Sequence, residues 1–128
     1  MWTLMFSLII LALLVLGGVL FLWWKQKRMR AVSMSAAKKS WTKLDAIPDP
    51  GRRILEAQSI VDRALNTIGY RGTFGEKLKR IQSHHQEFSD VWEALKLRNR
   101  IAHEPGTRVT EKEAQKALKA FKRFLHTL

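Results

Sequence analysis

The first 24 residues form an apolar stretch without a charged side chain. The run LMFSLIILALLVLGGVLFLWW, residues 4–24, is 21 residues long. At about 1.5 Å of rise per residue, a helix of this length crosses a hydrocarbon core of roughly 30 Å. The pattern therefore predicts a single transmembrane anchor over residues 1–24.

Aromatic and basic residues mark the two ends of this predicted anchor. Trp2 stands at one end and Trp23 and Trp24 at the other, as suits indole rings at the two membrane interfaces. The basic residues that follow are Lys25, Lys27, Arg28 and Arg30. Basic residues are retained on the cytoplasmic side of a membrane. We therefore expect a single-pass protein of the cell membrane, with its N-terminus outside and its C-terminal domain in the cytoplasm.

A cleaved signal peptide is the alternative interpretation of the same segment. Signal peptides begin with a basic region and contain an apolar core of about 7–15 residues. This chain has no basic residue before its apolar run, and the run is longer. Both features favour a permanent anchor.

A basic segment, residues 25–48, follows the anchor and contains no acidic residue before Asp45. Its last part places Trp41, Leu44 and Ile47 at three-residue spacing. This spacing predicts a linker with a short amphipathic helix. That helix either packs on the following domain or lies on the membrane surface. Packing on the domain is favoured, because few other apolar residues flank Trp41.

The next helix is predicted from Asp49 onward. Asp49 is suited to the N-cap and Pro50 to the first helical position, and Gly69 or Gly72 to the end. Its apolar face has helical spacing and consists of Ile54, Leu55, Ile60, Val61, Ala64, Leu65 and Ile68. A shorter helix follows, where Thr73 and Glu76 have capping-box spacing. Its apolar stripe is Phe74, Leu78 and Ile81.

Two further helices complete the predicted domain. The first starts with Ser89 or Asp90 as N-cap and ends near His103, because Glu104 precedes a proline. Its predicted buried face is Val91, Trp92, Ala94, Leu95, Ile101 and Ala102. The second starts with a capping box at Thr110 and Glu113. Its apolar stripe is Ala114, Ala117, Leu118, Phe121, Phe124, Leu125 and Leu128.

The patterns together predict an all-α protein. We expect one transmembrane helix and a basic juxtamembrane linker. A helical domain over residues 49–128 then forms a bundle of four or five helices. A core this small gains stability from dimerisation, so a homodimer is one expected state.

Charge and composition narrow the expected partners. The net charge is +12, and residues 25–43 alone hold seven basic and no acidic residues. Such a stretch attracts anionic lipid headgroups, by about 1 kcal/mol per basic residue near the surface. The remaining positive charge suits a polyanion such as RNA. The chain has no cysteine, which fits a reducing compartment and excludes disulfides and thiolate metal sites.

The four histidines do not have the spacing of a metal site. They are His84, His85, His103 and His126. Adjacent residues on a helix point about 100° apart, so a histidine pair alone does not chelate a metal. We expect no metal and no cofactor.

The stretch LRNRIAHEPG, residues 97–106, gathers the groups best suited to chemistry. Asn99 and His103 are four residues apart and share a helix face, while Arg98 lies about 140° from His103 on the helical wheel. Imidazole titrates near neutral pH and guanidinium binds phosphate with a planar fork of donors. Together they suit attack by an RNA 2′-hydroxyl on its own phosphodiester. The alternative is an ordinary helix end, where cationic residues are common because they suit the helix dipole.

The span LRNRIAHE, followed by a glycine-bearing loop and VTEKEAQKALKAFKRFL, resembles the HEPN superfamily of helical domains. The family signature is an arginine, four to six intervening residues and a histidine, often with a polar residue directly after the arginine. It maps here to Arg98, Asn99 and His103. The earlier ILEAQSIVDRALNTIGYRGTFGEKL is similar to the first long helix and turn of small HEPN proteins, so the resemblance covers residues 41–128.

The resemblance implies an all-α bundle and frequent dimers with two motifs facing across a cleft. It also implies metal-independent endoribonuclease activity, although other members are non-catalytic binding modules. The first hypothesis is therefore a membrane-anchored endoribonuclease acting on the cytoplasmic side. The second is a non-catalytic, membrane-tethered module that binds a protein or nucleotide partner. Exposure of Arg98 and His103 in a cleft or interface would favour the first hypothesis. Intramolecular salt bridges or caps with Glu93 or Glu104 would favour the second hypothesis.

Overall fold

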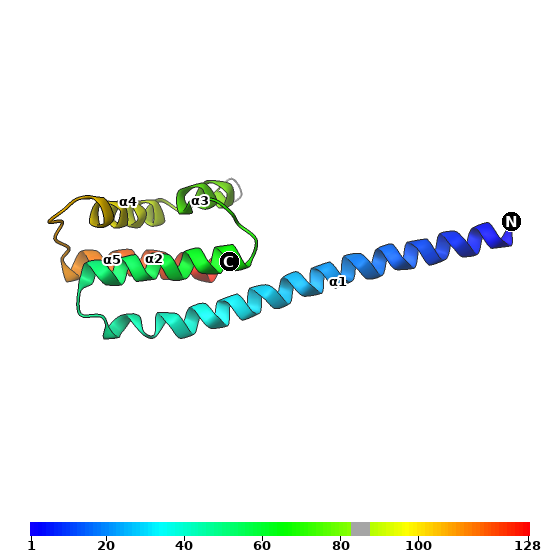
Figure 1. Ribbon diagram of the computed structural model, residues 1–128, viewed down its shortest axis with the longest axis horizontal. Coiled ribbons are helices and arrows are strands. Elements are labelled where there is room, and N and C mark those ends of the chain that lie inside the picture. Colours follow the sequence, from blue (N-terminus) through cyan, green and yellow to red (C-terminus); the bar gives the residue numbers. More distant parts are fainter. Residues whose placement is uncertain (83–87) are drawn as a thin grey trace.

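The computed structural model describes residues 1–82 and 88–128, and these residues are all-helical (Figure 1). The elements are α1 (Trp2–Trp41), a 3₁₀ turn η1 (Leu44–Ala46), α2 (Pro50–Thr67), α3 (Phe74–Gln82), α4 (Ser89–His103) and α5 (Glu111–Thr127). The predicted all-α class is confirmed. The histidine pair at His84 and His85 lies outside the described residues.

Helix α1 continues well past the predicted end of the anchor. The predicted linker begins at residue 25, but the helix runs without interruption to Trp41. Residues 25–41 contain no proline and no glycine, so no residue there disrupts the helical hydrogen bonding. The basic segment is thus mostly the second half of α1, and the short helix predicted around Trp41, Leu44 and Ile47 corresponds only to the 3₁₀ turn η1.

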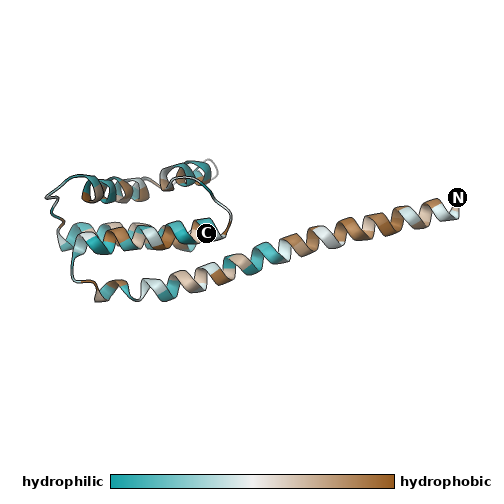
Figure 2. Cartoon of the chain, viewed as in Figure 1, coloured by the Kyte–Doolittle hydropathy of each residue, from teal (hydrophilic) through white to brown (hydrophobic). Residues whose placement is uncertain are grey.

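The two halves of α1 have different surroundings. The apolar half extends away from the bundle (Figure 2). Its large side chains from Trp2 to Trp24 are exposed. One helix near the N-terminus is thus long and apolar enough to span a membrane. The final third packs on α2, where Ser33 and Ala37 are buried and the Ser33 hydroxyl donates a hydrogen bond to the Ala64 carbonyl at 3.3 Å. The segment predicted to pack on the domain also does so, because Leu44 is buried and Trp41 and Ile47 pack against the core.

The core of the bundle is built around α2, which contacts α1, α4 and α5. Its side chains are mainly those of the predicted apolar stripes. The largest fully buried apolar residues are Ile54, Leu65, Leu78, Leu125, Val61, Val91, Phe121 and Phe124. Phe74 and Phe121 meet edge to face with centroids 6.0 Å apart, and Phe88 and Phe124 do so at 5.1 Å. Such pairs stabilise a core beyond the area that they bury.

Three members of the predicted buried face of α4 are not fully buried. Trp92 and Ile101 are half-buried, and Ala102 is exposed. In the last turn of α4, Ile101 still packs against the core, whereas the neighbouring Ala102 is open to solvent. Helical spacing alone does not reveal where a covering element stops.

Local hydrogen bonds fix three helix starts as predicted. The Asp49 carboxylate accepts from the Arg52 amide at 2.7 Å. The capping boxes at residues 73–76 and 110–113 are both formed. Each of these contacts joins residues three apart, so the sequence pattern determines them directly.

The start of α4 differs from the prediction. The N-cap is Phe88 rather than Ser89 or Asp90, and it makes no side-chain cap. The Asp90 carboxylate instead accepts from the Val91 amide at 3.0 Å. Because Phe88 is buried against Phe124, tertiary packing sets the first residue of this helix.

An ion pair ties the start of α2 to the start of α5. The Arg53 guanidinium donates to both carboxylate oxygens of Glu111, with Nη1 to Oε1 at 2.9 Å. Gln115 donates a further hydrogen bond to the same carboxylate. The hydrogen bond from Arg53, followed by that from Gln115, lowers the pKa of Glu111 from its ordinary 4.5 to about 2.

We expect this pair to make the fold sensitive to acid. Between pH 4.5 and about 2, the unfolded chain binds a proton at Glu111 that the folded chain does not. The stabilisation is therefore complete above pH 4.5 and is lost as the pH falls through this window. Urea midpoints of the full-length protein in detergent micelles should fall more steeply over this range than those of Glu111→Gln. Parallel curves for the two proteins would contradict the role of this carboxylate.

Candidate functional site

A cleft of about 740 Å³ lies between α2, α3 and α4, and we call it the α2–α3–α4 cleft. The turn before α3 and the first turn of α3 form one of its walls. Two of the three motif residues, Arg98 and Asn99, line it from α4. Its other lining residues are Gln58, Ser59, Asp62, Arg63, Gly72, Thr73, Phe74, Gly75, Glu76, Lys79, Trp92 and Leu95.

Arg98 has unused hydrogen-bonding capacity in this cleft. Its Nη1 donates to the Asn99 side-chain oxygen at 3.2 Å. Its Nε is buried and has no hydrogen-bond partner among the described residues. Because this Nε is enclosed by protein atoms, the terminal nitrogens of the guanidinium are the donors that a ligand acceptor such as a phosphate oxygen would meet.

His103 lies at the end of α4, one turn beyond Asn99, and is exposed. It is not among the residues that line the cleft. The helix ends there as predicted, because Glu104 is extended before Pro105. This end of α4 faces away from the N-terminal half of α1 (Figure 1).

Among the described residues, neither Glu93 nor Glu104 forms an ion pair with Arg98 or His103. Glu93 pairs with Lys116, whose Nζ lies 2.9 Å from its Oε2. In the described parts of the chain, Arg98 and His103 form no ion pair with Glu93, Glu104 or any other carboxylate. The structure thus brings Arg98 and Asn99 together at the cleft and leaves His103 free, but separate from them.

Lys77 is buried next to the cleft, and its burial was not anticipated from the sequence. The Lys77 side chain is 2% exposed, and its Nζ donates to Asp62 and Asn66, each at 2.6 Å. Asp62 in turn lines the cleft. Lys77 is three residues after Phe74 and four before Ile81, which places it on the apolar face of α3. That position was the available signal for its burial.

Trp92 lines the cleft, although the sequence pattern assigned it to the core. Its indole Nε1 donates to the Gln82 side-chain oxygen at 2.8 Å, which holds the ring in place. Trp92 and Asn99 are seven residues apart and therefore lie on one face of α4. This shared face was the signal that Trp92 could line the same site.

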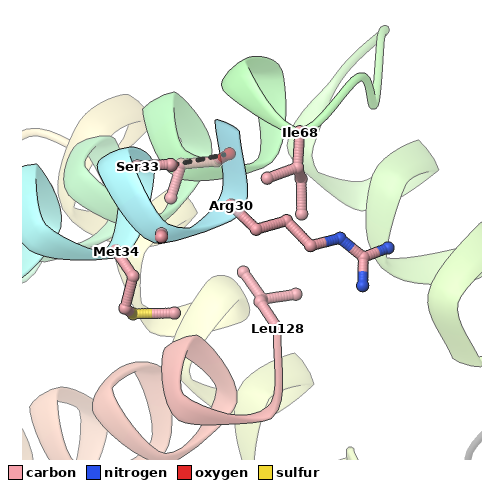
Figure 3. Close-up of a pocket in the computed structure, with 7 residues that line it drawn as sticks. Arg30, Ser33, Met34, Ile68 and Leu128 are labelled. Atoms are coloured by element: carbon pink, nitrogen blue, oxygen red, sulfur yellow. Dashed lines mark hydrogen bonds between the residues drawn. The ribbon is translucent and has the colours of Figure 1, made fainter. Parts of the chain in front are cut away.

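The predicted membrane-interface residues all lie exposed along α1. Lys27 Nζ lies 5.3 Å from the Trp23 ring centroid, and Arg28 Cζ lies 5.5 Å from that of Trp24. Arg30 borders an apolar pocket of about 240 Å³ between α1, the end of α2 and Leu128 (Figure 3). The basic residues therefore form one collar between the apolar half of α1 and the bundle.

Known proteins add no further guide to this site. Comparison with protein-family models, with curated proteins and with solved structures finds no match to this chain. The resemblance to the HEPN superfamily therefore rests on the motif in α4 and on the order of the helices.

Proposed function

We propose that this protein is a membrane-anchored endoribonuclease of the HEPN type that cuts RNA without a metal ion. One observation carries the proposal: no carboxylate of the described chain engages Arg98 or His103. The half-buried Arg98 lines a cleft, and His103 is exposed at the end of the same helix. Both side chains are thus available to a phosphodiester and its 2′-hydroxyl.

The proposed reaction uses the RNA 2′-hydroxyl as its nucleophile. His103 takes the proton from this hydroxyl, and the 2′-oxygen forms a bond to phosphorus. The bond from phosphorus to the 5′-oxygen breaks, and the leaving oxygen receives a proton from water. Arg98, oriented by Asn99, stabilises the charge that develops on the phosphate. The products carry a 2′,3′-cyclic phosphate and a 5′-hydroxyl.

A homodimer would bring the separated groups together. Within one chain, His103 does not line the cleft that holds Arg98. Ala102 is small and exposed beside His103, so the end of α4 allows the close approach of a second copy. In this arrangement, His103 of one protomer serves the Arg98 of its partner.

Mixing two inactive variants tests this arrangement. If the site is shared, Arg98→Ala and His103→Ala proteins should recover about a quarter of the native activity after their subunits are exchanged, because half of the dimers then hold one intact site. A site formed within each chain predicts no recovery.

The anchor determines where the reaction takes place. We propose that the apolar half of α1 crosses the cell membrane with its N-terminus outside, and that the basic collar lies against anionic headgroups on the cytoplasmic side. Because α1 continues into the bundle as one helix, the domain is held close to the membrane. The end of α4 faces away from the N-terminal half of α1 (Figure 1). In the proposed orientation, RNA approaches this end from the cytoplasm.

The test is RNA cleavage by the full-length protein in detergent micelles with EDTA present. We expect fragments ending in 2′,3′-cyclic phosphate, identified by mass spectrometry. The absence of cleavage over a range of RNAs and protein concentrations would overturn the proposal.

The second candidate is a non-catalytic, membrane-tethered module that binds a protein or nucleotide partner. The separation of His103 from the cleft favours it. It predicts that an RNA or nucleotide still binds through Arg98 while no phosphodiester is cut, so the same assay combined with a binding measurement separates the two candidates.

A further inference from the structure

We propose that the α2–α3–α4 cleft is a nucleobase-binding subsite in which an unpaired base of the bound RNA stacks on Trp92. The inference rests on the proposed function, because it assigns the nucleotide next to the phosphate that Arg98 holds. Trp92, Gly75 and the charge of the cleft carry it.

Trp92 has the features of a stacking platform. It lines the cleft and is only half-buried, so part of its ring faces the open space. The hydrogen bond from its indole nitrogen to Gln82 satisfies its polar group and fixes the ring orientation. A ring held in this way loses little conformational freedom when a base stacks on it.

Gly75 leaves space beside this ring. A Cβ atom added at Gly75 would lie 3.9 Å from Trp92 Cζ3 and 3.9 Å from Leu95 Cδ2, which is ordinary contact. Neither packing nor backbone conformation therefore requires glycine there, and glycine is a poor helix former. The absence of a side chain at Gly75 leaves that side of the cleft open beside Trp92.

The charge of the cleft suits a nucleotide. Arg63, Lys79 and Arg98 line it, and Lys77 lies buried behind it. The carboxylates that face the cleft are Asp62, which is paired with Lys77, and Glu76, which caps the start of α3. Three cationic residues thus line the cleft against two carboxylates, and both carboxylates are already engaged.

The dimensions fit one base with its phosphate. A volume of about 740 Å³ lies in the range of small-molecule pockets, roughly 300–1,000 Å³. Trp92 and Asn99 are seven residues apart, which is about 10 Å along α4. A base on Trp92 therefore belongs to a nucleotide adjoining the phosphate at Arg98. Bases of a duplex are stacked on one another, so the subsite selects single-stranded RNA.

The test measures binding without cleavage. A fluorescently labelled oligonucleotide with 2′-O-methyl groups lacks the nucleophile, so the full-length protein in detergent micelles binds it but cannot cut it by the proposed reaction. We expect Trp92→Ala to weaken its binding at least about tenfold in fluorescence anisotropy, and Trp92→Phe to retain most of the affinity. Trp41→Phe, at the other half-buried tryptophan of the bundle, serves as the matched control and should bind as the native protein does.

A second pair of variants keeps the result independent of Trp92. Gly75→Leu should fill the cleft and weaken binding at least about tenfold, whereas Gly75→Ala should bind almost as the native protein does. An abasic oligomer of the same length should bind equally well to native and Trp92→Ala protein, because it has no base to stack.

The failures of the two proposals are distinguishable. Unchanged affinity in Trp92→Ala and Gly75→Leu would overturn the subsite, even if RNA is cleaved. Binding that depends on Trp92 without any RNA cleavage would support the subsite and remove the ribonuclease. If Trp92→Ala lowers the urea midpoint, the comparison of Gly75→Leu with Gly75→Ala decides.

Discussion

Replacement of His103 by alanine is expected to lower the rate of RNA cleavage by about 10²–10⁴-fold, the usual contribution of general acid–base catalysis. The side chain is exposed and forms no hydrogen bond or ion pair with the described residues, so the urea midpoint should not change. Initial rates on a labelled RNA, measured in EDTA, give the comparison.

His126→Ala provides the matched control. His126 is also exposed and lies in the last turn of a helix, α5, but it is outside the motif. Its rate should equal that of the native protein. Native activity in His103→Ala would remove this residue from the reaction.

Arg98 is expected to tolerate even a conservative replacement poorly. Arg98→Lys keeps the charge but loses the planar fork of donors, which includes the Nη1 that donates to Asn99. We expect the cleavage rate of Arg98→Lys to lie close to that of Arg98→Ala. Recovery of activity by lysine would mean that only a point charge is needed there.

The second large effect is expected at the ion pair between Lys77 and Asp62, beside the cleft. Asp62→Ala should lower the free energy of unfolding by about 3 kcal/mol, because it leaves the ammonium group of Lys77 buried without its counter-charge. Lys77→Met should cost less, under about 1 kcal/mol, since methionine fills a similar volume and the remaining carboxylate is partly hydrated. The Asp62 side chain is 30% exposed, against 2% for Lys77.

Urea unfolding of the full-length protein in detergent micelles measures this asymmetry. Glu93→Ala is the control, because it breaks the exposed pair with Lys116 and should leave the midpoint unchanged. Equal losses in Asp62→Ala and Lys77→Met would show that the desolvation of Lys77 does not govern this pair.

Sequence and structure agree where the interactions are local. The caps at Asp49, Thr73 and Thr110 join residues only three positions apart, so their spacing is visible in the chain. The apolar stripe of α5 repeats with the period of a helix, and almost all of its members are buried. The apolar run at the N-terminus needs only its length and composition to indicate a helix able to span a membrane.

In the candidate site too, the sequence predicted the local relations and the fold decided the rest. Helical spacing alone placed Asn99 and His103 on one face, yet Asn99 lines the cleft and His103 does not. The wall that makes this difference comes from α2 and α3, which are distant in sequence. Spacing within α4 carries no information about how far that wall extends.

By itself, the sequence determined the helices, their main caps and the chemical groups of the motif, because these depend on side chains within one or two turns. Only the tertiary structure decided the remaining features: the packing of the end of α1 on α2, the start of α4 at Phe88, the burial of Lys77 and the position of the half-buried Trp92 in a cleft. Each of these depends on a partner from another helix. Lys77 is the clearest case, because Asp62 and Asn66 lie 15 and 11 residues before it and allow a charge to occupy a position where the period of α3 calls for an apolar side chain.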